Sequence, residues 1–265
     1  MGWSYLGILL AVSAVLCGVG FYKYVYFLSI GYGFAVGGIS IALFISSVTG
    51  YFTAGMQHYL LFAVLFIYGI RLSGFLLARE MKNAAYRKTL SEVTGDEAKM
   101  PFGIKLAIWI SVSALYVAQT CPLFYRLYNG GKTSGLGWAA IVICIFALIL
   151  ETLSDKQKND QKRKRPDMVA TEGLYKLVRC PNYLGEILFW TGIFVSGWDV
   201  LQGFGQWLMA VLAYICIVYI MFNGAQRLER RQMKRYEDNV EYHAYAGRIP
   251  ILIPFVPLYH LNKQK

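Results

Sequence analysis

The segment LVRCPNYLGEILFW, residues 177–190, places polar side chains at the start of an apolar helix. Arg179, Asn182 and Glu186 recur at i, i+3 and i+7, so they share one helical face. Pro181 stands where the first turn of a helix tolerates proline. An amide and a carboxylate suit a carboxamide, ribose hydroxyls or adenine, and an arginine suits phosphate. The pattern therefore favours a nucleotide ligand, with a capping and interhelical hydrogen-bond cluster as the alternative.

A second candidate lies in FIYGIRLSGFLLARE, residues 66–80, where Arg71 falls well inside an apolar run. A charge at that depth costs several kcal/mol unless it is paired or solvated, so it indicates a functional site by default. The alternative is an arginine whose stem is buried while its head reaches the membrane surface. Tyr68 precedes Arg71 by one turn on the same face, and its phenol would enter any cavity that Arg71 lines.

Polar residues also close the apolar segment before this helix. Glu151 and Asp155 are spaced i, i+4, and Gln157 and Lys158 follow directly. The basic run KRKRP then ends the helix, because Pro166 cannot continue it.

The chain ends with a basic stripe and a proline-rich tail. Helical spacing places five basic residues on one face, which suits either anionic headgroups or phosphate: Arg227, Arg230, Arg231, Lys234 and Arg235. Tyr242, Tyr245 and Arg248 precede the apolar ending ILIPFVP. We expect this ending to fold back against the membrane or the helix bundle.

The elements that position these residues are membrane-spanning helices. The 265 residues are 57% hydrophobic and 15% charged with a mean hydropathy of +0.44, which is more apolar than a soluble domain. The apolar residues form blocks of about 20, the length that crosses a bilayer. We predict an all-α, polytopic integral membrane protein with seven transmembrane helices, at about 3–22, 24–49, 59–79, 102–124, 136–153, 183–198 and 204–223.

Lysine and arginine concentrate in alternate connections, which predicts the orientation. The connections after spans one, three, five and seven are basic, whereas those after spans two and six have no lysine or arginine. This places the N-terminus outside and the C-terminus in the cytoplasm. Residues 3–20 lack a basic leader and a cleavage site, so we interpret them as a span. Gly33 and Gly37, spaced small-xxx-small, predict close helix packing.

Several function classes are excluded or disfavoured. The formal charge of +11 follows from topology, so we expect no nucleic-acid partner. The five cysteines form no C-x-x-C pair, and the three histidines are far apart, so we expect no metal site. No strand precedes a G-x-G-x-x-G, which excludes a Rossmann domain.

The segment GLYKLVRCPNYLGEILFW resembles the signature of the steroid 5α-reductase family and related bacterial membrane reductases. The resemblance covers residues from about 151 to 254, and more weakly the YGIR of residues 68–71. It implies a seven-helix membrane enzyme, a single domain over 1–265, with a cofactor cavity open to the cytoplasm. About 1–135 would form the substrate side and about 136–265 the cofactor-binding half.

The resemblance further implies that the cofactor is NADPH. Carried over to this chain, its contacts would be Asp155, Arg163, Tyr175, Arg179, Asn182, Tyr183 and Glu186, together with Arg227, Tyr242, Tyr245 and Arg248.

The implied chemistry is hydride transfer to the β-carbon of an activated C=C bond in a lipophilic substrate such as a 3-oxo-4-ene steroid. A donor at the carbonyl oxygen would stabilise the developing enolate. Tyr68 resembles the family's tyrosine in this role, with Arg71 as support. The family also uses a glutamate on an early span, but here no acidic residue precedes Glu80. Gln57 and His58 are the nearby polar candidates.

Two rival interpretations stay open. Isoprenylcysteine-type membrane methyltransferases, which bind S-adenosylmethionine, share parts of the pattern, but the asparagine of PNY favours a reductase. A non-catalytic lipid-binding protein could keep the same fold. Cys180 stands where many bacterial relatives have histidine. We expect a monomer in a bacterial inner membrane, surrounded by membrane lipids.

Overall fold

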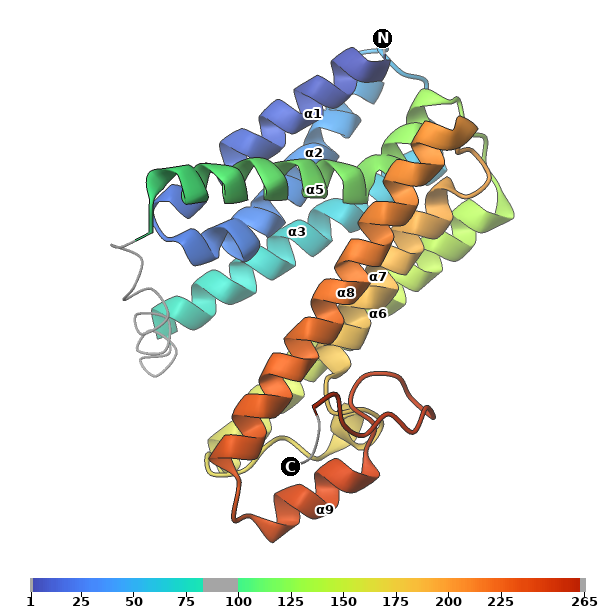
Figure 1. Cartoon of the computed structure of the whole chain (residues 1–265). Coiled ribbons are helices and arrows are strands. Elements are labelled where there is room, and N and C mark those ends of the chain that lie inside the picture. The colour runs from blue at the N-terminus through green and yellow to red at the C-terminus, as the bar shows by residue number, and fades with distance from the viewer. Residues whose placement is uncertain (1, 83–99, 263–265) are drawn as a thin grey trace. The chain divides into compact units, whose positions relative to one another are not determined.

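The computed structural model describes residues 2–82 and 100–262, and within these ranges the chain is helical and contains no strand (Figure 1). The helices are listed by their bounds: α1 Gly2–Cys17, η1 Gly18–Phe21, η2 Tyr24–Leu28, α2 Ile30–Val48, α3 Met56–Lys82, α5 Phe102–Tyr128, α6 Gly135–Lys164, η4 Gly173–Lys176, α7 Pro181–Gly197, α8 Gly203–Arg235 and α9 Val240–Arg248.

Six of the described helical segments are long and apolar enough to cross a membrane, in α1, α2, α3, α5, α6 and α8. Each predicted apolar segment is helical, but the predicted count of seven spans is one too high by this measure. The difference is α7, which has 17 residues and is therefore short for a bilayer core of about 30 Å. The fold is that of an all-α, multi-pass membrane protein.

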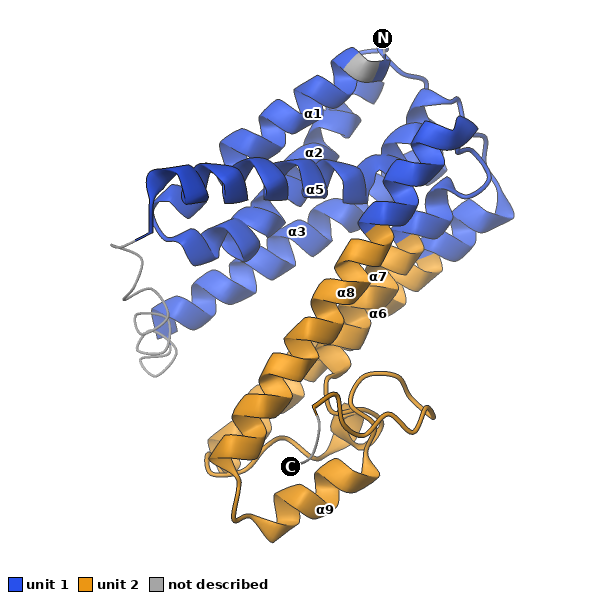
Figure 2. Cartoon of the chain, viewed as in Figure 1, with its two compact units in different colours: residues 1–141, 193–213 blue, residues 142–192, 214–265 orange. Residues whose placement is uncertain are grey.

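The chain divides into two compact units (Figure 2). Unit 1 comprises residues 1–141 and 193–213, and unit 2 comprises 142–192 and 214–265. These bounds differ from the predicted halves because the C-terminal part of α7 and the N-terminal part of α8 belong to unit 1. The assignment of the halves to substrate and cofactor stays a prediction.

Within unit 1, α2 contacts α1, α3 and α5. The crossing of α2 with α3 is close because it occurs at glycines. A Cβ atom on Gly33 would lie 2.5 Å from the carbonyl oxygen of Gly69, and one on Gly69 would lie 2.8 Å from the backbone nitrogen of Gly37. A larger residue at position 33 or 69 would force the backbones apart, whereas a Cβ on Gly37 would lie 3.9 Å from the Phe66 ring, an ordinary contact. The predicted close packing at Gly33 and Gly37 is confirmed, because a Cβ on Gly69 would meet the backbone of both.

Within unit 2, α6 ends at Lys164, shortly before Pro166 as expected. Glutamine side chains then shape the following loop: Gln157 Oε1 accepts the backbone N–H of Leu174 at 2.9 Å, and Gln161 Oε1 accepts that of Thr171 at 2.8 Å. Gly173 has a φ of +65°, which favours glycine, and a Cβ there would meet the Gln157 side chain at 2.4 Å. These contacts position the loop that leads into α7.

Candidate functional site

The polar start of α7 is held by the C-terminal tail. The backbone nitrogens of Arg179 and Cys180 donate to the carbonyl oxygens of Pro250 and Ile251, both at 2.9 Å, and α7 begins at Pro181. The tail therefore folds back onto unit 2, as the sequence predicted.

Arg179 is buried and forms an ion pair that the sequence analysis did not identify. Its Nη2 lies 2.9 Å from Oε1 of the fully buried Glu229 and also donates to the carbonyl oxygen of Tyr259. Glu229 further accepts the backbone N–H of Leu261 at 2.9 Å and the side-chain amide of Asn262 at 2.7 Å. The available signal was the single acid within the basic run of residues 227–235.

Two buried polar atoms beside this ion pair, Nε of Arg179 and the hydroxyl of Tyr242, make no hydrogen bond of normal geometry within residues 2–82 and 100–262. Burial raises the pKa of Tyr242, and the positive charge of Arg179 opposes that rise, which shows that the two side chains are close enough to interact electrostatically. A buried donor without a partner costs stability unless a ligand or water completes it. Unit 2 thus contains a polar cluster suited to an oxygen-rich anion.

Three predicted residues gather around Tyr175 in the same unit. Its hydroxyl donates to the carbonyl oxygen of Ser154 at 3.2 Å, and the hydroxyl of Tyr245 donates to the carbonyl oxygen of Tyr175 at 2.7 Å. Burial raises the pKa of Tyr175, and the negative charge of Asp155 adds to the rise, as does the proximity of Tyr183. The structure therefore brings Asp155, Tyr175, Tyr183 and Tyr245 into one neighbourhood.

Asn182 and Tyr183 are half-buried at the start of α7, and Glu186 is buried one turn later. Oε1 of Glu186 accepts the indole N–H of Trp190 at 3.1 Å, which fixes the orientation of the carboxylate. Gly185 brings α7 against α6, since a Cβ there would lie 2.3 Å from Cγ of Glu151. These contacts hold the polar start of α7 against α6.

The three outlying arginines of the prediction lie at the surface of unit 2. Arg163, Arg227 and Arg248 are exposed, and within the described part of the chain none hydrogen-bonds to Arg179 or Tyr175. Their contact with a cofactor stays a prediction. The five basic residues of α8 are all exposed, so the predicted stripe exists as a surface feature.

The predicted catalytic tyrosine lies in unit 1. Tyr68 is fully buried, and its hydroxyl donates to the hydroxyl of Tyr32 at 3.0 Å. The ring of Tyr32 stacks on Tyr116 with centroids 4.6 Å apart, and the Tyr116 hydroxyl donates to the carbonyl oxygen of Phe27 at 2.8 Å. Arg71 is half-buried, with its guanidinium 6.0 Å from the centre of the Phe75 ring.

Unit 1 also contains a buried arginine, whose partners the sequence did not predict. Arg126, at the end of α5, is 0% exposed and links the ends of α3, α6 and α7. Nη1 of Arg126 donates to the carbonyl oxygen of Ser196 at 2.8 Å and to Oδ1 of Asp199 at 2.7 Å. Nη2 donates to three acceptors: Gln57 Oε1 at 2.9 Å, the carbonyl oxygen of Lys132 at 2.7 Å and Ser134 Oγ at 2.9 Å. Gln57 is thus engaged with Arg126.

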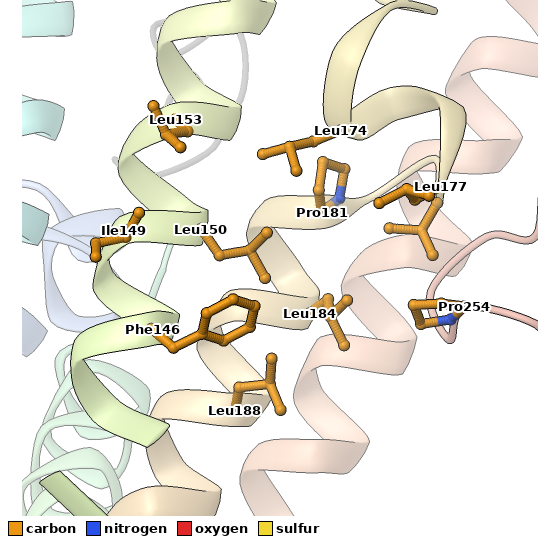
Figure 3. Close-up of a pocket in the computed structure, with 11 residues that line it drawn as sticks. Phe146, Ile149, Leu150, Leu153, Leu174, Leu177, Pro181, Leu184, Leu188 and Pro254 are labelled. Carbon is orange, nitrogen blue, oxygen red and sulfur yellow. The ribbon is translucent and has the colours of Figure 1, made fainter. Parts of the chain in front are cut away.

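Unit 2 also has a pocket of about 360 Å³, and its lining side chains are all apolar (Figure 3). The lining includes none of the residues predicted to bind the cofactor. The pocket is therefore separate in its chemistry from the polar cluster at Arg179.

The fold and these sites define a multi-pass, all-helical membrane protein with a buried polar cluster at the start of α7. The profile of a family described as a protein of unknown function, DUF1295, matches residues 30–249. The chain belongs to this family. No curated protein and no solved structure gave a significant match to the chain.

Proposed function

We propose that the protein is a membrane-embedded reductase that uses NADPH to reduce the activated C=C bond of a lipophilic enone, as steroid 5α-reductases do. The observation that carries the proposal is the buried cluster of unit 2, where Arg179 Nε and the Tyr242 hydroxyl make no hydrogen bond of normal geometry with any described residue. Phosphate and ribose oxygens are the acceptors that such donors require.

The residues present fit the polar parts of a dinucleotide. Arg179, oriented by Glu229, would bind phosphate, while Asn182 and Glu186 offer the amide and carboxylate that suit a carboxamide or ribose hydroxyls. When bound, NADPH supplies the hydride. Arg163 of α6 and Arg227 of α8, both exposed, would add favourable charge around the phosphates.

In this proposal Tyr68 polarises the substrate carbonyl. Its hydroxyl now donates to Tyr32, so it must exchange that acceptor for the carbonyl oxygen of the enone. The stacking of Tyr32 on Tyr116 holds this hydrogen-bonding pair in place. A donor at that oxygen stabilises the negative charge that develops as the β-carbon receives hydride.

Ligand-dependent thermal unfolding of detergent-purified protein tests the cofactor. NADPH should stabilise the protein by about 2.7 kcal/mol at a hundredfold excess over its dissociation constant. Asn182→Ala should lose this shift, whereas the control Asn223→Ala, on α8 of the same unit, should keep it. A shift with S-adenosylmethionine alone would make the protein a methyltransferase, and no shift with any nucleotide would favour a non-catalytic protein.

Enone reduction by the Tyr68→Phe variant tests the catalytic role. Loss of one donor to an oxyanion lowers turnover by about 10²–10³-fold. The control is Tyr59→Phe, on the same helix, which should turn over normally. Tyr68→Phe should still bind NADPH, so unchanged turnover in this variant would remove Tyr68 from the mechanism.

The lysine and arginine distribution further supports an outside N-terminus and a cytoplasmic C-terminus in a bacterial inner membrane. We propose that the protein works there as a monomer. Labelling of cysteines introduced at Gly130 and at Glu237 in intact cells would show which connections are outside.

A further inference from the structure

The apolar pocket of unit 2 is built from four segments. Side chains of α6, of residues 174–178 and of α7 point into one space, and Pro254 of the tail completes it (Figure 3). No polar side chain lines it. An enone would require a hydrogen-bond donor at its carbonyl, so the lining suits a saturated hydrocarbon chain instead.

The pocket opens toward the surroundings of the protein. Ile149 and Leu153 of α6 are 52% and 43% exposed, and Leu177 at the other side is 52% exposed. Because α6 is apolar enough to cross a membrane, the medium around Ile149 is lipid. A lipid chain can therefore enter from the bilayer.

Two exposed lysines lie where the headgroup of such a lipid would be. Lys156 follows Ile149 and Leu153 on the same helical face, about 4.5 Å further along the axis than Leu153. Lys176 stands in the chain between Leu174 and Leu177, which both line the pocket. Between residues 155 and 179 the chain has eight basic and four acidic residues, so the local charge favours an anion.

We propose that this pocket binds one acyl chain of an acidic glycerophospholipid, whose anionic headgroup is held by Lys156 and Lys176. The site is independent of the reductase proposal because it shares no residue with the polar cluster of Arg179. The bound lipid fills the space between α6 and α7 and ties the 174–178 segment to both helices.

Native mass spectrometry of delipidated, detergent-purified protein tests the site. In a titration, one phosphatidylglycerol should bind more tightly than phosphatidylcholine with the same acyl chains. Lys156→Gln and Lys176→Gln should each weaken phosphatidylglycerol binding about fivefold. The control Lys234→Gln, an exposed lysine on α8 of the same unit, should leave the affinity unchanged.

A second pair of variants tests the apolar part. Leu184→Trp should fill the pocket and abolish binding of the lipid, whereas Ile215→Trp, an exposed α8 position outside the pocket, should not. Leu177→Gln at the exposed mouth should weaken binding without threatening the fold, which covers the case that Leu184→Trp does not fold. Glycerol phosphate, which lacks the chains, should not bind.

Three results would overturn the proposal. They are equal affinity for phosphatidylcholine and phosphatidylglycerol, unchanged binding in both the Leu184→Trp and Leu177→Gln variants, and binding of glycerol phosphate as tight as that of the lipid.

Discussion

Buried arginines near helix ends occur in both units, and their environments differ. Arg126 in unit 1 makes five hydrogen bonds through Nη1 and Nη2 to four segments, and its partner Asp199 is 26% exposed. The side chain of Arg179 in unit 2 donates through Nη2 to Glu229 and Tyr259, and in both arginines Nε makes no hydrogen bond of normal geometry with a described residue.

The difference is the basis for proposing a structural role for Arg126 and a binding role for Arg179. Arg126 uses both terminal nitrogens to join helix ends, so a ligand would have to displace existing bonds. Arg179 keeps donor capacity beside the Tyr242 hydroxyl, while a fully buried carboxylate fixes its position. An arginine that is oriented but incompletely satisfied is suited to an incoming anion.

The largest expected effect is the loss of Arg126. Arg126→Met leaves Asp199 without its cation and Gln57 and Ser134 without their shared donor. Breaking such a pair by removing one partner costs on the order of 3 kcal/mol of unfolding free energy. Chemical denaturation in detergent should show this loss. The control Lys132→Met, which removes an exposed side chain from the loop that contains Ser134, should not show it. Equal stability of both variants would contradict a joining role for Arg126.

Arg179→Met should destabilise the protein less, by roughly 1–2 kcal/mol, because Glu229 retains hydrogen bonds from the 260–262 segment. Its main consequence should be loss of stabilisation by NADPH in the thermal assay. Arg231→Met, which removes an exposed arginine of α8, should retain that stabilisation. If NADPH still stabilised Arg179→Met against thermal unfolding, Arg179 would have no binding role that distinguishes it from Arg126.

Acid should weaken unit 1 through Asp199. Burial raises the pKa of this carboxyl. Hydrogen bonds from Ser134 and Arg126, together with the charge of Arg126, lower the pKa by more than burial raises it, so the pKa of Asp199 lies below its usual value. A lowered folded-state pKa contributes stability above the unfolded value of about 3.9, and this stability is lost as the pH falls through the folded pKa. Thermal unfolding between about pH 3 and pH 7 should therefore show an acid slope that is flatter in Asp199→Asn. An identical slope in both proteins would mean that Asp199 is not coupled to Arg126.

The smallest effect should come from the ion pair of Arg165 with Glu241, whose atoms are 2.8 Å apart but exposed. Solvent and salt screen such a pair. Arg165→Gln should unfold with the same midpoint as the parent within replicate scatter, at low and at high salt. A clear midpoint shift would show that an exposed arginine here matters as much as a buried one.

The length of the apolar blocks predicted the helices well, because a membrane span is encoded by consecutive residues. The exception is α7, whose 17 residues begin with the polar face of Asn182 and Glu186, so its apolar part is short. The sequence also predicted that Arg179, Asn182 and Glu186 share one face, because i, i+3 and i+7 spacing is a property of one helix; the function of that face stays a prediction.

The partners of the two arginines could not be predicted in this way. Arg126 meets Gln57 and Asp199 across separations of 69 and 73 residues, and Arg179 meets Glu229 across 50. Such pairs depend on which helix ends converge, and one helical pattern contains no information about that. Glu229 also lies among basic residues, and an acidic residue in such a run usually indicates an exposed helix face.

The glycine crossing of α2 and α3 has a consequence for how the protein is made. Gly33 and Gly69 lie on consecutive helices, and the loop between these helices is short. The two helices can therefore associate as a hairpin while the later helices are still being synthesised, since the contact needs no distant segment. The remaining helices of unit 1 would then assemble on a surface that biogenesis has already fixed.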